Sequence, residues 1–205
     1  KKTLFIWPEG VFYETYLNDI KKYQDLFEKN FNENHYIVLG INSFSQIDES
    51  INKKYYNSLV ILNYKLDILY LYNKVDLVPF GEFLPFENFF HKLGLKKVTS
   101  GYNSFSSGVK REIFNLGFEF DEKLILPLIC YEIIYSGKIK KSNQFPDLVI
   151  NISEDAWFGR SIGPYQHFAK AIYRSVEEGI FIARSANQGM SAFIDPNGRV
   201  IKSLN

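Results

Sequence analysis

Residues 124–132 read LILPLICYE: an apolar run, then the single cysteine of the chain, Tyr131 and Glu132. The run from Leu124 to Ile129 has the length and composition of a buried strand. A helical pattern follows it, so Cys130 lies where a strand turns into a helix. Such a turn exposes a nucleophile at the carboxyl end of a strand. The alternative interpretation is a buried core cysteine that takes no part in chemistry.

Short apolar runs alternate with longer amphipathic ones on both sides of this stretch, which is typical of an α/β protein. The chain has 205 residues and no repeat or linker, which favours one domain. The predicted strands are Thr3–Ile6, Tyr36–Ile41, Tyr55–Asn63, Asp67–Asn73, Lys123–Ile129, Leu148–Ile152, Phe181–Ser185 and Met190–Ile194. The predicted helices are Glu14–Asn30, Phe86–Leu93, Glu132–Lys140 and Pro164–Glu178, with Gly94–Phe120 expected as a loop holding at most one strand.

The last of these helices has clear end signals. Pro164 suits a first turn, Phe168, Ile172 and Val176 recur at helical spacing, and Gly179 suits the C-cap. We therefore expect this helix to begin and end close to the residues given.

Composition excludes several classes of protein. Hydrophobic residues make up 46% of the chain and the net charge is +1, so neither disorder nor a nucleic-acid-binding surface is expected. No apolar run reaches the ~20 residues that a membrane-spanning helix needs. One cysteine cannot form an internal disulfide, and His35, His91 and His167 have no metal-ligand spacing. We expect no metal and no cofactor.

Two charged residues also follow apolar strands. Glu9 lies between Pro8 and Gly10 after the first strand, and Lys74 follows the strand that ends at Asn73. A nucleophilic cysteine needs a nearby base and a nearby cation, which these residues could supply. Taken singly, each could equally be a solvated loop charge.

Three motifs together resemble the nitrilase, or carbon-nitrogen hydrolase, superfamily. They are WPE (residues 7–9), NKVDLVPFGE (73–82) and ICYE (129–132). The resemblance implies an αββα sandwich with mixed sheets flanked by helices. It also implies a catalytic triad of Glu9, Lys74 and Cys130, with Glu82 as a second structural and catalytic glutamate.

Within the superfamily, further motifs resemble the apolipoprotein N-acyltransferase family. They are DAWFG (155–159), GPYQH (163–167), RSANQG (184–189) and IDPNGR (194–199), in order along the chain. Two segments depart from that family: Ser-Asn-Asp is usual where this chain has Ser153-Glu154-Asp155, and Gly-Arg-Pro is common where it has Gly179-Ile180-Phe181.

The resemblance implies transfer of an acyl chain from a phospholipid, through a thioester on Cys130, to the α-amino group of a diacylglyceryl-cysteine at the start of an apolipoprotein. Tyr131 and Glu132 would set the nucleophile's loop and the cavity wall. Trp157 and Phe158 would contact the acyl chain, although core packing is the commoner role for such residues.

The family's membrane helices, the opening strand of its domain, and its last strand and closing helix are expected to lie outside residues 1–205, making this a catalytic domain truncated at both ends. The expected location is a bacterial inner membrane with the domain on the periplasmic side. Two alternatives remain open: a soluble amidase that uses the same three residues with water, and a non-enzymatic, membrane-associated interaction domain that has kept the fold.

Overall fold

The computed structural model describes residues 1–46, 53–83, 104–117, 120–139 and 145–204. Four strands form a first sheet in the order β1-β2-β3-β4. Their bounds are β1 (Thr3–Ile6), β2 (His35–Gln46), β3 (Lys53–Asn63) and β4 (Ile68–Asn73). β1 pairs with β2 in parallel, whereas β2, β3 and β4 pair antiparallel, so the sheet is mixed.

Six strands form the second sheet in the order β10-β9-β8-β7-β6-β5. They are β5 (Phe114–Asn115), β6 (Leu124–Ile129), β7 (Leu148–Glu154), β8 (Phe181–Asn187), β9 (Ser191–Ile194) and β10 (Val200–Leu204). The central strands β6, β7 and β8 run in parallel, and antiparallel strands lie at both edges.

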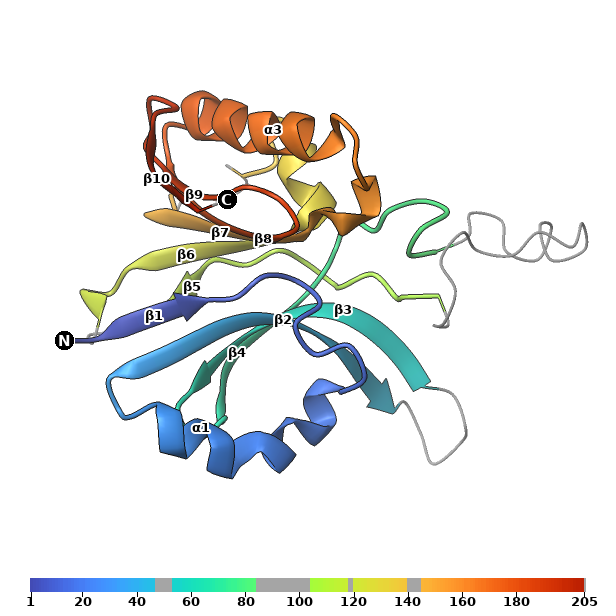
Figure 1. Ribbon diagram of the computed structural model, residues 1–205, viewed down its shortest axis with the longest axis vertical. Coiled ribbons are helices and arrows are strands. Elements are labelled where there is room, and N and C mark those ends of the chain that lie inside the picture. Colours follow the sequence, from blue (N-terminus) through green and yellow to red (C-terminus); the bar gives the residue numbers. More distant parts are fainter. Residues whose placement is uncertain (47–52, 84–103, 118–119, 140–144, 205) are drawn as a thin grey trace, which may run out of the picture.

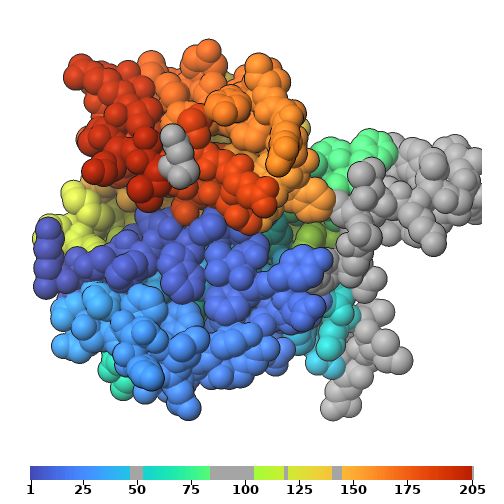
Figure 2. Space-filling model, viewed as in Figure 1, coloured from blue at the N-terminus to red at the C-terminus, as the bar shows by residue number. Residues whose placement is uncertain are grey.

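The two sheets lie face to face, and helices cover their outer faces (Figure 1). A 3-10 helix, η1 (Leu17–Tyr23), and α1 (Gln24–Asn30) cover the first sheet, and α3 (Gly163–Glu178) covers the second. Short 3-10 helices η3 (Cys130–Ile134) and η4 (Asp155–Phe158) follow β6 and β7. In the space-filling view, the amino-terminal and carboxyl-terminal layers adjoin directly (Figure 2). The predicted αββα sandwich is confirmed.

The alternation of side chains along each strand explains the layers. In β2, Ile37 and Leu39 pack against η1 and α1, while Val38 between them points at the other sheet. Both sheets therefore bury both faces. The cluster between the sheets contains Val38, Leu59, Ile61, Tyr72, Ile125, Ile129, Ile150 and Ile152. Burial of this apolar surface is the main force that holds the sheets together.

All eight predicted strands are present, with ends that differ by a few residues. β5 lies in Gly94–Phe120, the loop that was expected to hold at most one strand, and β10 was not predicted. The helix at Pro164–Glu178 is confirmed, with Gly179 as its left-handed C-cap at φ 63°. Glu14–Asn30 is helical only from Leu17, first as a 3-10 helix and then as α1. The prediction at Phe86–Leu93 lies outside the described residues.

The predicted helix at Glu132–Lys140 is wrong. The 3-10 helix η3 ends at Ile134, since Tyr135 has extended backbone angles and Gly137 has φ 67°. The backbone leaves the helical conformation at Tyr135, and the positive φ of Gly137 keeps the next residues from resuming it, despite their helical spacing. No helix among the described residues is long and apolar enough to cross a membrane.

Ile150 tests the contribution of the layer between the sheets. Its side chain is fully buried there. We expect Ile150→Ala to lower the free energy of unfolding by about 2–5 kcal/mol, because it leaves a cavity that two sheets cannot close. The control Ile201→Ala, on the exposed strand β10, should change it by less than about 0.5 kcal/mol. Urea denaturation measures both, and equal effects would contradict this account of the core.

Candidate active site

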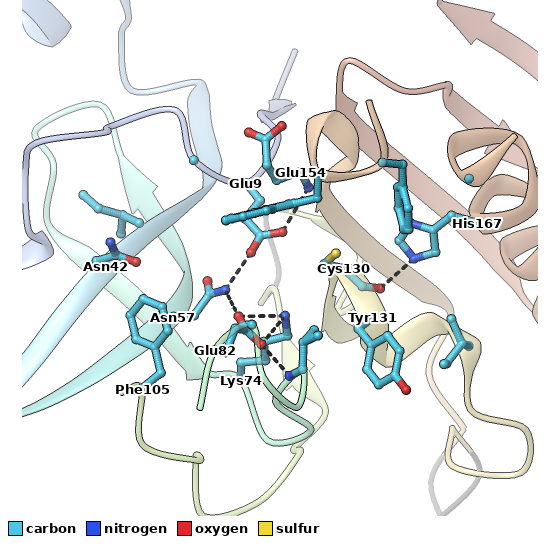
Figure 3. A pocket seen from close by; sticks show the side chains of 18 of the residues that line it. Glu9, Asn42, Asn57, Lys74, Glu82, Phe105, Cys130, Tyr131, Glu154 and His167 are labelled. Atoms are coloured by element: carbon cyan, nitrogen blue, oxygen red, sulfur yellow. Dashed lines mark hydrogen bonds and ion pairs between the residues drawn. The ribbon is translucent and has the colours of Figure 1, made fainter. Parts of the chain in front are cut away.

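Cys130 sits at the turn between β6 and η3 with a left-handed backbone, φ 47°. A non-glycine residue in this region is strained and needs support from its surroundings. In return, the turn directs the side chain away from the sheet and towards a cavity, where Cys130 is one of the lining residues (Figure 3). The nucleophile-like position predicted from the sequence is therefore present.

Glu9 reaches the same cavity from the loop after β1. Its Oε1 accepts a hydrogen bond from Asn57 Nδ2 at 2.6 Å, and its Oε2 accepts one from the Glu154 backbone N–H at 3.0 Å. The loop crosses β2 closely at Gly40, where an added Cβ would lie 2.6 Å from Glu9 Cα. Glycine at that position is what lets the loop lie against the strand.

Lys74 follows β4 and is almost completely buried, with 1% of its surface exposed. Its Nζ lies 3.0 Å from Glu82 Oε1 and 2.9 Å from Oε2, so the ammonium is paired. Asn57 Nδ2 also donates to Glu82 Oε1 at 2.7 Å, and the Val78 N–H donates to Oε2 at 2.8 Å. Asn57 thus joins the two carboxylates, and neither Glu9 nor Lys74 is a solvated loop charge.

Burial and charge shift the acid-base properties of all three groups. Burial raises the pKa of Glu9, an effect that the Lys74 ammonium opposes and the Glu82 carboxylate reinforces. Burial alone would lower the pKa of Lys74, but the Glu9 and Glu82 carboxylates hold it above its ordinary value. Burial and the Glu9 carboxylate raise the pKa of Cys130 to about 11, against the opposing effect of Lys74. The resting thiol is therefore protonated beside a carboxylate with increased affinity for a proton.

The cavity has a volume of about 650 Å³ and largely apolar walls, and Glu9, Asn57, Lys74 and Glu82 lie together in it (Figure 3). Trp157 and Phe158, which follow β7 in η4, line it while exposing 68% and 41% of their surfaces. Tyr131 also lines it, next to the cysteine. Core packing is the commoner role for a tryptophan, but Trp157 is too exposed for that role.

Glu132 is buried and does not line the cavity. Its Oε2 accepts from the Ile129 N–H at 2.8 Å, while Oε1 accepts from the Val75 and Asp76 N–H groups at 3.0 and 3.1 Å. One carboxylate thus ties the strand that carries Cys130 to the segment just after Lys74. These contacts agree with the expectation that Glu132 influences the loop of Cys130. Glu132 was also expected in the cavity wall, and it does not lie there.

Sequence reasoning did not identify Asn57, Asp155 or His167 as site residues. Asn57 lies inside a strand with no local signal, and only the sheet register brings it to Glu9. His167 is buried on α3, with Nε2 3.2 Å from the Cys130 carbonyl oxygen and Nδ1 2.9 Å from Asp155 Oδ1. Asp155 and His167 lie in the motifs DAWFG and GPYQH, which indicated a family resemblance but no role for either residue.

Comparison with known proteins gives the same picture. The profile of the family described as carbon-nitrogen hydrolase matches residues 6–205. The apolipoprotein N-acyltransferase of Rhizobium rhizogenes is 33% identical over 201 residues, which are 98% of this chain and 37% of that protein. The apolipoprotein N-acyltransferase of Rhodopseudomonas palustris is 43% identical over 149 residues, 73% of this chain and 27% of that protein. The predicted resemblance is confirmed, and the chain spans less than two fifths of these relatives' length.

Solved structures of an amidase from Nesterenkonia sp. AN1 share the fold. A mutant with covalent addition of the acetamide moiety of fluoroacetamide at its active site cysteine has a TM-score of 0.64 and 14% identity, covering 98% of this chain and 73% of the amidase. The amidase after removal of its tag has a TM-score of 0.62 and 14% identity. At this identity the likeness concerns the fold alone.

The Asp155 carboxylate gives a pH-dependent test of the polar cluster behind Cys130. Burial alone would raise its pKa, but His167 and Arg184 lower it to about 2 from the ordinary 3.8. A depressed pKa contributes stability above the unfolded value that is lost as the pH falls towards the folded value. We expect Asp155→Asn to lower the free energy of unfolding by about 2 kcal/mol near neutral pH, with the difference from wild type narrowing below about pH 4. Urea denaturation across this pH range measures it, and a pH-independent difference would contradict the assignment.

Proposed function

The chain belongs to the carbon-nitrogen hydrolase family, and from that premise we propose that it moves an acyl chain from a phospholipid to the α-amino group of an apolipoprotein's N-terminal diacylglyceryl-cysteine. The observation that carries the proposal is the placement of Cys130, Glu9 and Lys74 around one end of an apolar-walled cavity. The names of its bacterial relatives supply the apolipoprotein acceptor and the transfer of an acyl group to nitrogen, whereas the phospholipid donor and the diacylglyceryl-cysteine follow from the family resemblance. Lipoprotein maturation is the corresponding process.

In the first step, Glu9 takes the thiol proton of Cys130, and the sulfur attacks the ester carbonyl of the phospholipid. The raised pKa of Glu9 favours its accepting that proton. Lys74 stabilises the oxyanion, a contribution worth about 3–4 kcal/mol per donor. As the C–O bond of the ester breaks, Glu9 returns its proton to the leaving oxygen. The products are a lysophospholipid and a thioester on Cys130.

In the second step, the amine of the diacylglyceryl-cysteine attacks the thioester carbonyl. Glu9 accepts the proton that the nitrogen loses, the C–S bond breaks, and Cys130 is reprotonated as the amide leaves. Glu82 keeps the Lys74 ammonium in place through both steps by its contacts at 2.9 and 3.0 Å, which is a positioning role.

The cavity walls suit an acyl chain better than a small polar amide. Trp157 and Phe158 present large apolar surfaces at the cavity, and Ile134 and Val78 also line it. We assign the acyl chain to this apolar part, with the ester carbonyl at the polar end beside Cys130. An exposed tryptophan at the cavity edge would also be stable at a lipid surface.

A lipid donor favours a membrane location. A domain that takes its acyl chain from a bilayer reaches it more readily when anchored there. We propose that the intact protein lies in the bacterial inner membrane with this domain on the periplasmic side. The amidase alternative has no matching support, since the amidase structures are only 13–14% identical to this chain.

The nucleophile can be tested by mass. Incubating the full-length protein with phospholipid should add one acyl chain to the tryptic peptide Leu124–Lys138, which contains Cys130. Cys130→Ala and Cys130→Ser should form no adduct and show no transfer, because neither offers a comparable thiolate. Their melting temperatures should stay close to that of the wild type. An adduct on another peptide, or turnover by the alanine variant, would refute the role of Cys130.

Lys74 and Glu9 can be tested together. Lys74→Met removes the ammonium and keeps much of the apolar stem, so thioester formation should slow by on the order of a hundredfold. Glu9→Gln should slow it comparably, because an amide cannot accept the thiol proton. The double variant should lose less than the product of the two effects, since residues of one catalytic unit are not additive. Rapid-quench kinetics measures the rates, with the exposed Lys123→Met as control. A wild-type rate for Lys74→Met would make that lysine structural.

A further inference from the structure

A buried polar cluster lies behind Cys130, between the second sheet and α3. Its central members are Ser153 and Arg184 on β7 and β8, Asp155 in η4 and His167 on α3. All four are among the buried polar residues of the described chain. Burying polar side chains costs free energy unless they form hydrogen bonds or ion pairs. We therefore expect these four side chains to hold fixed positions.

Asp155 is the anchor of the cluster. Its carboxylate lies 2.7 and 3.0 Å from Arg184 Nη2, and Ser153 Oγ donates to its Oδ1 at 2.7 Å. Gly189 packs so closely that an added Cβ would lie 2.2 Å from Asp155 Oδ2. Asp155 is therefore held by these bonds and by close packing against Gly189.

His167 connects this anchor to the nucleophile. Its Nδ1 lies 2.9 Å from Asp155 Oδ1 and 3.2 Å from Arg184 Nη2. Its Nε2 lies 3.2 Å from the carbonyl oxygen of Cys130 (Figure 3). A carbonyl oxygen can only accept a hydrogen bond. The Nε2 nitrogen must therefore carry a hydrogen, whether Nδ1 donates to Asp155 or accepts from Arg184.

We propose that His167, held by Asp155, is a positioning residue that fixes the backbone of Cys130 by donating a hydrogen bond from Nε2 to its carbonyl oxygen. The role rests on the proposed function of Cys130 as nucleophile. It differs from the roles of Glu9 and Lys74, because His167 acts on the peptide group of the cysteine and not on the reacting atoms.

The backbone of Cys130 explains why such a contact matters. At φ 47° the residue is in a region that side chains other than glycine adopt only under constraint. The backbone angles of the residue fix the direction of its carbonyl and of its Cα–Cβ bond, from which the thiol extends. Holding the carbonyl therefore keeps the thiol pointed at Glu9 and Lys74.

The cluster influences the cysteine in a second way and also reaches the cavity wall. Ser153, whose Oγ donates to Asp155, also acts to lower the pKa of the Cys130 thiol, so one group bonded to Asp155 influences the sulfur and another holds the carbonyl. The ring of Phe158 packs edge-on against His167 with centroids 5.5 Å apart. A change at His167 therefore alters both the support of the Cys130 carbonyl and the packing of Phe158 in the cavity wall.

A matched pair of variants separates positioning from simple packing. The side-chain amide of His167→Gln can place a donor where Nε2 lies, whereas that of His167→Asn reaches only the position of Nδ1. The probe is iodoacetamide, which needs no lipid. Its rate of reaction with Cys130 is read from the mass of the tryptic peptide Leu124–Lys138 in the full-length protein. His35→Gln, remote from the cavity lining, is the control.

We expect His167→Asn to slow alkylation by about tenfold or more and to lower kcat with little change in KM, because small misplacements of a reacting group are costly. His167→Gln should restore most of the rate, and His35→Gln should match the wild type. Wild-type alkylation in a folded His167→Asn protein, or equal losses in both His167 variants, would overturn the proposal. If alkylation follows the expected order but no acyl transfer occurs, the proposed function fails while the role of His167 stands.

A measurement on the wild type covers variants that fail to fold. In the full-length protein with ¹⁵N-labelled histidine, the His167 signal is assigned by replacing the other histidines in turn. Its Nε2 should show a directly bonded proton. An Nε2 without a proton could not donate to the Cys130 carbonyl, and that result would overturn the proposal.

Discussion

The buried ammonium of Lys74 is the constraint on which the rest of the site depends. An unpaired charge at this depth would strongly favour unfolding or loss of the proton. Glu82 satisfies it directly, and Glu9 acts on it through the electric field of its carboxylate. Asn57 bonds to both carboxylates and so fixes the distance between them. The same arrangement that makes the charge tolerable keeps it beside the Cys130 thiol, where it opposes the effect of burial.

The two sheets bring these groups together because each contributes strand ends at one end of the sandwich. Glu9, Asn57 and Lys74 come from the first sheet, and Cys130 comes from the second. The site is thus formed between layers whose contact is the apolar cluster behind it. Glu132 adds a polar link between the layers at the same place. Apolar packing sets the distance between the sheets, and the Glu132 carboxylate sets how they align beside Cys130.

Much of this arrangement was predictable from strand ends. Apolar runs followed by Glu9, Lys74 and Cys130 predicted three reactive groups at the ends of strands. The family motifs predicted that these groups lie together in one site. Asn57 could not be found in this way, because it lies within a strand and becomes important only through sheet register. The helix expected after Cys130 failed for a local reason, since the backbone becomes extended at Tyr135 and Gly137 has a positive φ. His167 was ruled out as a metal ligand and otherwise appeared only within a family motif, because its actual contacts depend on how α3 packs on the sheet.

The departure from the family pattern at Glu154 leaves the site intact, for a physical reason. The backbone N–H of Glu154 donates to Glu9, and any residue except proline at this position would provide the same N–H. The side chain turns to other partners, accepting from the Ala156 N–H at 3.1 Å and from Asn187 Nδ2 at 2.7 Å. The substitution therefore adds a carboxylate to the cavity edge and keeps the contact that orients the base.

The fate of a preformed thioester tests the central claim most directly. The full-length protein would be loaded with a labelled acyl chain on Cys130, freed of phospholipid, and mixed with a diacylglyceryl-cysteine peptide with a free α-amino group. The account predicts that the label appears as an amide on the peptide faster than as free fatty acid. Release of the label as free fatty acid at the same rate with and without peptide would contradict it and identify a hydrolase.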